Sequence, residues 1–549
     1  MIGRRQFLRR SAALALSAAS LSCGQGRKPN IIILFSDELS LDDLGCYGGD
    51  YPTPHLDALA AGGVLFTRAY SAASMCTPSR YSLLTGRYPG RCRHPGFVNA
   101  FPENVPYSIA WNTFIDASVP TLARILSRSG YMTGMVGKWH AGRLPAGIDR
   151  PAFKTDENPA DPDVDARLRA EQTLLAARVM EQGGFDYAGS VIWENNDNHA
   201  LEAMRVHNFP WITRSAVKFI ERGAATGAPF LLYAATTAVH GPNHTLSLER
   251  DLRYTPGGRI DDVAGYGVDP EEIRRMLDQR PGVNRHRLAG VADLDAHVGR
   301  IVSALHRLGI EKETLIFFLS DHNIEPGKAT AYEKGVRIPM IAHWPGVIPA
   351  GRTCGAMVQS IDLMPTALEV AGTGTAATFD GRSIYPLLRR PELSGREWIY
   401  IESGYTRAVT DGRFKYLAFR PPPDVVQRME RGELDYAANH LNVFKQAHSS
   451  IAMEHYPAYF QPDQLYDLQV DPYEQHNLAA DPAFASVLEK LRGELARFLA
   501  DFNHPFDLSV PEYMLGREYQ ILVRRTLAVG TGHIPWLRRD HGRIVWPPE

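Results

Sequence analysis

Cys76 stands two residues before a proline, and a serine, an arginine and an apolar run that ends at Gly86 follow. Because Pro78 fixes the local φ angle, this stretch predicts a loop that enters a helix with Cys76 near its N-terminus, where backbone N–H groups and the helix dipole favour anions. Arg80 follows one turn later on the same side, and its planar guanidinium suits a tetrahedral oxyanion. A lone cysteine is more often an inert buried thiol. The spacing nevertheless predicts a thiol-derived group that is presented to a sulfate or a phosphate.

Acidic residues follow two stretches that have the character of buried strands. Asn30–Ser36 and Thr314–Ser320 are continuous apolar runs, typical of strands that are covered on both faces of a parallel sheet. The residues directly after them are Asp37 and Glu38 in the first case and Asp321 and His322 in the second. Because open α/β sheets place their sites at the carboxyl ends of strands, this arrangement predicts one cation shared between two strand ends.

Basic residues occupy further positions of the same kind. Lys138 and His140 follow a short predicted strand, and residues two apart at a strand exit point to the same face. His240 follows a buried strand predicted over residues 229–234, and we expect it to be exposed with a pKa near about 6.5. Lys328 comes six residues after His322. Each of them alone would be interpreted as a surface lysine or a loop histidine, and only the whole set predicts a catalytic site.

The run Cys76-Thr-Pro-Ser-Arg, followed by Leu-Thr-Gly-Arg, resembles the maturation signature of the type I sulfatases, a family of the alkaline phosphatase-like superfamily. The run Gly-Lys138-Trp-His140 resembles the second signature of the same family. The resemblance implies that a formylglycine-generating enzyme is a maturation partner and converts Cys76 to formylglycine (3-oxoalanine). The hydrated aldehyde of that residue would be the nucleophile.

The resemblance also implies roles for the other side chains. Arg80, Lys138 and Lys328 would hold the sulfate group, His140 would act as a base, and His240 would protonate the leaving alcohol. One Ca²⁺ would be held by Asp37, Glu38, Asp321, His322 and the modified residue at Cys76. The sequence departs from the family at Glu38, where a second aspartate is usual. The imidazole of His322 is an atypical ligand for Ca²⁺, which prefers oxygen.

The implied reaction is hydrolysis of a sulfate ester on a sugar or an aryl alcohol, through a covalent sulfo-enzyme intermediate. Two alternatives stay open at this point. A phosphonate monoester or phosphodiester hydrolase would use the same modified residue, and a non-catalytic carbohydrate-binding relative would use the fold alone. The complete set of reactive and charged side chains argues against the binding relative, because a binding module needs no such set.

The sequence predicts an α/β fold in two parts. Residues 29–390 form a catalytic domain with a large, mostly parallel sheet sandwiched by helices, and residues 391–549 form a smaller C-terminal subdomain. Strand-like runs at residues 398–402, 408–410 and 414–419 predict a small antiparallel sheet, and apolar spacing over residues 482–502 predicts a helix. Two stretches, residues 421–460 and 504–549, have no counterpart in the family pattern.

Residues 1–28 have the features of a twin-arginine export signal rather than of folded structure. Arg4 and Arg5 begin the pattern, and the apolar run over residues 12–21 is shorter than the roughly 20 residues that a membrane-spanning helix needs. The prediction is export to the periplasm or cell surface. Cys23 lies in a lipoprotein-like box, which leaves a soluble and a lipid-anchored product open.

Composition excludes some classes of function but does not indicate one. A net charge of -2 and an apolar content of 44% are ordinary for a globular protein and give no electrostatic reason to expect nucleic acid as a partner. Setting aside Cys23 and Cys76, three of the five cysteines remain, so at most one disulfide is expected between them. We expect substrate specificity, for a small-molecule or oligosaccharide sulfate ester, to come from surface loops at residues 93–116, 144–184, 194–210, 244–281 and 421–460.

Overall fold

The computed structural model describes residues 27–324, 326–374, 377–430, 452, 455–517, 519, 538–540 and 543–545. The predicted export signal, including Cys23, lies outside these residues except for its last two positions. Much of the predicted insertion at residues 421–460 and most of the tail after residue 517 also lie outside them. The expectations for those stretches stay predictions.

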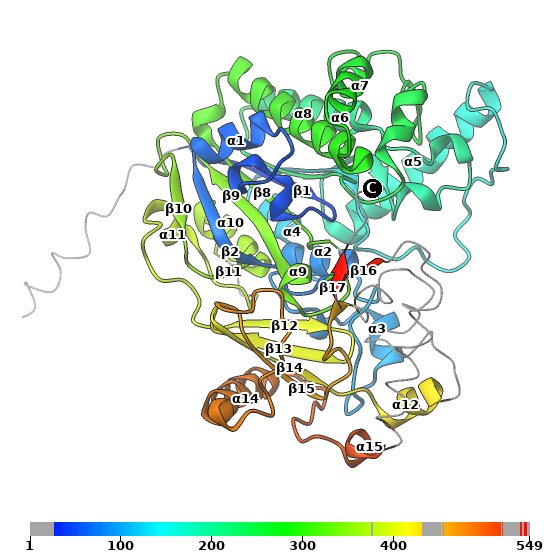
Figure 1. Ribbon diagram of the computed structural model, residues 1–549. Coiled ribbons are helices and arrows are strands. Elements are labelled where there is room, and N and C mark those ends of the chain that lie inside the picture. The colour runs from blue at the N-terminus through cyan, green and yellow to red at the C-terminus, as the bar shows by residue number, and fades with distance from the viewer. Residues whose placement is uncertain are drawn as a thin grey trace, which may run out of the picture.

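A large mixed sheet forms the centre of the protein (Figure 1). Its strands run in the order β10-β2-β9-β8-β1-β5-β3-β4, and β11 pairs with β2. The consecutive strands from β8 to β4 are mutually parallel. Their bounds are β8 (Thr314–Ser320), β1 (Asn30–Ser36), β5 (Phe230–Ala235), β3 (Met132–Lys138) and β4 (Tyr187–Ile192). The predicted large, mostly parallel sheet is confirmed.

The other side of the sheet breaks the parallel order. β9 (Arg337–His343) pairs antiparallel with both β8 and β2 (Val64–Tyr70). Two short strands, β10 (Arg352–Cys354) and β11 (Val358–Gln359), pair parallel with β2. The parallel part of the sheet therefore contains β1 at its middle, and the antiparallel strand lies next to β8.

Side chains of β1 enter two hydrophobic layers, because successive residues of a strand point to opposite faces of the sheet. Ile31, Ile33 and Phe35 belong to one buried cluster, and Ile32 and Leu34 belong to another. Helices cover both faces, as Figure 1 shows. The first layer includes residues of α2 (Cys76–Thr85), α4 (Leu122–Arg128), α5 (Pro162–Gly183) and α10 (Leu363–Val370), and the second includes residues of α1 (Pro54–Ala61), α6 (Phe209–Thr226) and α8 (Arg285–Arg307).

The prediction of surface loops over residues 144–184 is wrong in its second half, which forms the long helix α5. A proline lies in the first turn, where a helix tolerates it, and Gly184 ends the helix with a φ of 75°. Val164, Leu168 and Val179 are buried along its length. The acidic, proline-rich composition just before the helix concealed this helical spacing.

A second sheet, which is antiparallel, lies at the bottom of Figure 1. It consists of β12 (Ile399–Ser403), β13 (Thr406–Thr410), β14 (Phe414–Phe419) and β15 (Asp463–Asp467), and α14 (Ala485–Leu499) packs on it. The predicted small antiparallel sheet and helix are confirmed, whereas β15 was not expected. This sheet supports the catalytic part, since Ser403 Oγ donates a hydrogen bond to the carbonyl of Ala329, 2.9 Å away, beside Lys328.

Shorter elements complete the described structure. They are α3 (Pro95–Ala100), β6 (Tyr254–Thr255), β7 (Gly258–Arg259), α7 (Pro270–Asp278), α9 (Glu333–Val336), α11 (Tyr385–Arg389), α12 (Pro423–Glu430), α15 (Glu512–Leu515), β16 (Arg538–Asp540) and β17 (Arg543–Val545). Met514 and Tyr519 are buried in the core that adjoins the second sheet, so this part of the tail packs on it.

Cys46, Cys76, Cys92 and Cys354 are free thiols, so the described residues contain no disulfide. Cys92 and Cys354 are buried in the hydrophobic layer beside the large sheet. In the described part of the chain, none of the helices has both the length and the apolar composition that a membrane crossing requires.

Candidate active site

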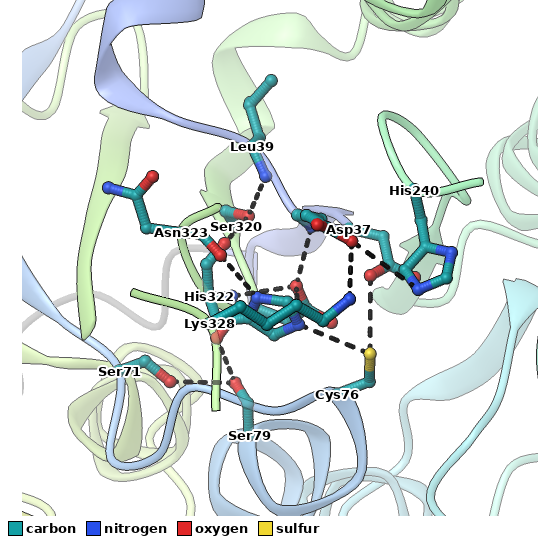
Figure 2. Close-up of polar contacts among 12 residues, drawn as sticks. Asp37, Leu39, Ser71, Cys76, Ser79, His240, Ser320, His322, Asn323 and Lys328 are labelled. Carbon is teal, nitrogen blue, oxygen red and sulfur yellow. Dashed lines mark hydrogen bonds and ion pairs between the residues drawn. The ribbon is translucent and has the colours of Figure 1, made fainter. Parts of the chain in front are cut away.

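The carboxyl ends of the parallel strands meet at one edge of the large sheet and bring polar side chains together. Asp37 follows β1, Asp321 follows β8, and Lys138 is the last residue of β3. His240 lies on the loop after β5, and Asn195 lies on the loop after β4. Figure 2 shows His240 pointing toward Asp37 from its loop. The topology of the sheet therefore builds one site from five separate stretches of chain.

Four buried side chains in this place could hold a metal ion: Asp37, Cys76, Asp321 and His322. One donor atom from each lies within 4.8 Å of the others. Cys76 Sγ lies 3.4 Å from His322 Nε2 and 3.6 Å from Asp37 Oδ1. His322 Nδ1 lies 2.7 Å from the carbonyl oxygen of Asn323, which only accepts, so Nδ1 donates and the lone pair of Nε2 faces the group. Two carboxylates with an imidazole lone pair fit a divalent cation.

Glu38 lies beside this group rather than among its four donors. Its backbone is left-handed, with a φ of 58°. Its carboxylate lies 2.6 Å from Lys328 Nζ and 3.6 Å from His240 Nε2. The predicted role of Glu38 as a metal ligand stays a prediction, and its observed partners are two of the predicted catalytic side chains.

Three acidic and three basic side chains offset one another here. Lys138 Nζ contacts a carboxylate oxygen of Asp37, and Arg80 Nη2 lies 3.4 Å from Asp37 and 3.2 Å from Asp321. The third pair is the contact of Lys328 with the glutamate described above. All of these side chains except the glutamate are at most 1% exposed. Because their charges sum to zero, a bound divalent cation gives the site a net positive charge that favours anions.

The two strand-end aspartates differ in their pKa values. Burial would raise the pKa of Asp37, but the charges of Lys138 and Arg80 hold it well below its usual value. Burial raises the pKa of Asp321, and the nearby negative charge of Asp37 raises it further. Asp37 is therefore the ionised member of the pair, and Asp321 takes up a proton more readily.

The prediction that His240 is exposed with an ordinary pKa is wrong. Its side chain is only 14% exposed, and burial together with the charges of Lys328 and Lys138 lowers its pKa to about 3. Burial and the charge of Lys138 also hold the pKa of His140 well below its usual value. Both histidines are neutral at pH 7 without a bound anion, and a sulfate between these cations would offset the repulsion and favour protonation.

Helix α2 begins at Cys76, as the sequence predicts, and all ten of its residues are buried. Burial raises the pKa of the Cys76 thiol to about 12, and the charge of Asp37 adds to the effect. Ser79 Oγ donates a hydrogen bond to the carbonyl of Asp321, 2.6 Å away, which ties the first turn of the helix to the end of β8. The position of Cys76 is therefore fixed against the metal-binding group.

A β-bulge aims Lys138 into the site. The register between β3 and β4 shifts between Val136 and Lys138, and Gly137 has a φ of 90°. A Cβ atom at Gly137 would lie 1.9 Å from the carbonyl oxygen of Ala235, so only glycine fits there. Lys138 Nζ then lies 2.5 Å from the side-chain oxygen of Asn195. Sequence reasoning missed Asn195, because β4 has no run of apolar residues that marks it as a strand.

The structure thus places the predicted catalytic residues in one buried site, and Asn195 is an addition to them. A family model described as Sulfatase matches residues 29–373. The chain belongs to the sulfatase family. Human arylsulfatase A (Homo sapiens) is 30% identical over 526 residues, which cover 88% of this chain and 89% of that protein.

Further relatives of this sulfatase agree. N-acetylgalactosamine-6-sulfatase of the dog (Canis lupus familiaris) is 32% identical over 433 residues, covering 73% of this chain and 74% of that protein. A solved structure from Bacteroides thetaiotaomicron, described with a genetic locus for the metabolism of multiple glycosaminoglycans, matches with a TM-score of 0.59. It is 23% identical and covers 86% of this chain and 100% of its own, which shows the fold. The protein is a sulfuric ester hydrolase with the alkaline phosphatase-like fold.

Proposed function

We propose that this sulfatase acts through a formylglycine at position 76 and one bound Ca²⁺, on the sulfate ester of a sugar or an aryl alcohol. The observation that carries the proposal is the buried group of Asp37, Cys76, Asp321 and His322, whose donor atoms lie within 4.8 Å of one another. The signature around Cys76 and the family membership support the modification. The two carboxylates support a hard cation, which prefers oxygen ligands.

The unmodified thiol of Cys76 is a poor nucleophile in this place, because its pKa of about 12 leaves almost no thiolate at neutral pH. The hydrated aldehyde of formylglycine, with the cation beside it, supplies a hydroxyl nucleophile. Asp321, whose pKa is raised, is the side chain best placed to accept the proton of that hydroxyl. In this proposal, His140 takes the proton of the second hydroxyl, the aldehyde re-forms and sulfate leaves.

Three cations hold the sulfate group in this proposal. Arg80, Lys138 and Lys328 surround the position that residue 76 occupies, and each has a carboxylate partner that fixes its side chain. Preorganised positive charge of this kind stabilises the negative charge that moves to the leaving oxygen. Asn195, which contacts Lys138, would orient that ammonium group.

His240 donates the proton to the leaving alcohol in this proposal. Its Nδ1 lies 3.0 Å from the carbonyl oxygen of Gly241, so Nδ1 donates and Nε2 is the atom that exchanges a proton. Nε2 lies 3.6 Å from the carboxylate of Glu38, which stabilises the protonated ring. Proton donation at this atom matters most for alcohols that are poor leaving groups.

Modification of Cys76 must precede folding. Every residue of α2 is buried, and the Cys76 side chain is buried with it, so a formylglycine-generating enzyme has no access to the folded chain. We infer that the twin-arginine signal exports a protein that is already modified in the cytosol. The destination is the periplasm or the cell surface, and a lipid anchor at Cys23 is one of the two products that its lipoprotein-like box allows.

The two alternative functions are weakened by different observations. The phosphonate monoester or phosphodiester hydrolase would share this site, but the curated relatives reported above are named sulfatases. The non-catalytic binding relative does not explain three cations paired to three buried or half-buried carboxylates around Cys76. Sulfate ester hydrolysis is therefore the reaction that the site serves, and the names of the relatives include both aryl and sugar substrates.

The direct test is hydrolysis of 4-nitrocatechol sulfate and of an aryl phosphonate monoester by protein that is co-produced with a formylglycine-generating enzyme. We expect sulfate release with a kcat/KM at least about 100-fold above that for the phosphonate. Cys76→Ala should abolish hydrolysis of both without changing the melting temperature by more than a few degrees. A preference for the phosphonate would overturn the proposal.

A further inference from the structure

A cavity of about 450 Å³ is lined by residues of the segments that carry His140 and Asn195 and is called the side groove here. Its lining includes Trp111, Phe114, Arg143, Trp193 and Glu194. Cavities of a few hundred Å³ that combine aromatic surfaces with a few polar groups are typical of ligand sites. None of these five residues takes part in the proposed reaction at Cys76, so the reaction alone does not account for the side groove.

Backbone hydrogen bonds join the side groove to the catalytic site. His140 N–H donates to the carbonyl of Trp193 at 2.9 Å, and Trp139 N–H donates to the carbonyl of Ile192 at 2.8 Å. Arg143 comes three residues after His140 in the chain. One wall of the groove is therefore the direct continuation of β3 and β4, which also deliver Lys138, His140 and Asn195.

The charge of Arg143 defines what the side groove can bind. Its side chain is exposed, and no other described residue forms a hydrogen bond or an ion pair with its guanidinium. Space for the group comes from Gly96, where an added Cβ would lie 2.9 Å from Arg143 Nη1. Glu194 is also exposed and accepts one hydrogen bond, from Asn198. An unpaired guanidinium beside aromatic surfaces suits an anionic ring with a flat apolar face.

We propose that the side groove binds the sugar next to the sulfated one, a pyranose ring that carries a carboxylate or a second sulfate. Arg143 pairs with that anion, Trp111 and Trp193 pack against the ring, and Glu194 accepts hydrogen bonds from its hydroxyls. The proposal rests on the proposed function and adds the substrate class, an acidic oligosaccharide. An aryl sulfate without a second anionic group would reach only the catalytic site.

The test uses competition, so it does not require that the oligosaccharide is cleaved. Hydrolysis of 4-nitrocatechol sulfate is measured with a disaccharide of a uronic acid and a 6-sulfated N-acetylhexosamine as inhibitor, and with the same disaccharide after reduction of its carboxyl group. We expect the acidic disaccharide to inhibit about tenfold more tightly, as one charged hydrogen-bonding pair implies. Arg143→Gln should remove that difference and leave the KM for the aryl sulfate unchanged.

The control is Arg128→Gln. Arg128 is also exposed, but it lies at the end of α4, just before β3 begins, and therefore near the opposite edge of the sheet from the site. This variant should keep the full preference for the acidic disaccharide. Equal inhibition by both disaccharides in the unaltered enzyme, or a preference that survives Arg143→Gln, would overturn the side-groove proposal. Absence of any aryl sulfate hydrolysis would instead count against the proposed function.

A different set of contacts concerns His207, which is 1% exposed and has hydrogen-bond partners in Asn196, Thr237 and Pro242. Its Nε2 lies 2.8 Å from the carbonyl oxygen of Pro242, so Nε2 donates, and its Nδ1 accepts from the hydroxyl of Thr237 at 2.7 Å. Its ring stacks on that of His244, with centroids 3.5 Å apart and planes 4° from parallel. His207 therefore holds the segment that carries His240 at both ends, through hydrogen bonds with Thr237 and Pro242.

We infer that His207 is a positioning residue for proton donation by His240. The inference depends on the proposed role of His240. If it holds, His207→Ala should slow hydrolysis of phenyl sulfate, which has a poor leaving group, about tenfold more than that of 4-nitrophenyl sulfate. A merely structural loss would slow both equally, and that result would overturn the inference. If the unaltered enzyme hydrolysed neither ester, that result would contradict the proposed function instead.

Discussion

The catalytic site and the side groove are neighbours, yet they are built on opposite principles. In the catalytic site, Arg80 is fully buried and its charge is met by Asp37 and Asp321. In the side groove, Arg143 is exposed, and among the described residues its guanidinium has no acidic partner. The first arginine is held in place before any substrate arrives, whereas the second is available to one.

This difference separates reaction from recognition. A preorganised, charge-balanced site serves any sulfate ester, because the sulfate group is common to all of them. An exposed cation in a neighbouring groove serves only substrates with a second anionic group. Changes in the catalytic site should therefore affect all substrates and often stability, whereas changes in the side groove should affect some substrates and leave stability alone.

The largest contrast is expected between the two arginines. Arg80→Ala leaves two buried carboxylates without this partner, so we expect at least about a 1,000-fold loss of activity on every sulfate ester and about 3–5 kcal/mol less unfolding free energy. Arg143→Ala should change the unfolding free energy by less than about 0.5 kcal/mol. Urea unfolding and aryl sulfate kinetics of both variants measure this, and similar stability losses in the two would break the comparison.

Removal of the divalent cation should have the next largest effect. Without it the side-chain charges of the site sum to zero, so a chelator should lower aryl sulfate hydrolysis at least about 100-fold, and added Ca²⁺ should restore it. The melting temperature should fall as well, because a cation that binds only the folded state stabilises it. Activity that is unchanged after exhaustive chelation, with no metal found by elemental analysis, would contradict this prediction.

Gly137 offers a test of backbone geometry within the site. Gly137→Ala should cost about 2–4 kcal/mol of unfolding free energy and displace Lys138, since the new Cβ meets the carbonyl of Ala235 at 1.9 Å. Gly147 is the matched control, because its φ of 74° is also positive but an added Cβ meets nothing within 4 Å. Chemical denaturation measures the unfolding free energy of both alanine variants. Equal losses would show that the cost comes from the positive φ alone and not from the contact with the carbonyl of Ala235.

An effect on stability that has opposite signs for two aspartates should depend on pH. Burial raises the pKa of Asp293, on α8, to about 7, so its ionisation destabilises the folded state increasingly from about pH 4 to 7 and fully above that. Asp293→Asn should therefore raise stability by about 2–4 kcal/mol at pH 8 and have little effect at pH 4.

Asp37 provides the comparison, because its pKa is lowered. Its ionised form contributes stability above about pH 4, and that contribution is lost as the pH falls through its lower folded-state pKa. Asp37→Asn should therefore reduce stability at pH 8. Melting curves at both pH values measure the two variants, and the same sign for both at pH 8 would refute the assignment.

The sequence predicted the parts of the site that follow strong local patterns. β1 and β8 are continuous buried runs, so the sequence alone places Asp37 and Asp321 at strand ends. The signature around Cys76 likewise predicted the start of α2. The α/β fold class followed from the same strands and from the family that the signatures resemble.

Other features depend on tertiary structure, and sequence patterns did not show them. His240 is largely buried, and burial together with the charges of Lys328 and Lys138, which come from other stretches of the chain, lowers its pKa. Asn195 follows β4, a strand without a continuous apolar run, and its role depends on a bulge in β3. The second half of residues 144–184 was assigned to loops because composition near its start outweighed the helical spacing of α5.

The central claim is that residue 76 acts as formylglycine, and one mass measurement tests it most directly. Trypsin should release residues 69–80 as one peptide, since Arg68 and Arg80 bound it. Protein co-produced with a formylglycine-generating enzyme should give this peptide with a mass about 18 Da below the cysteine form, and sulfate ester hydrolysis should rise with the modified fraction. Full activity in protein whose peptide carries only the unmodified thiol would contradict the claim.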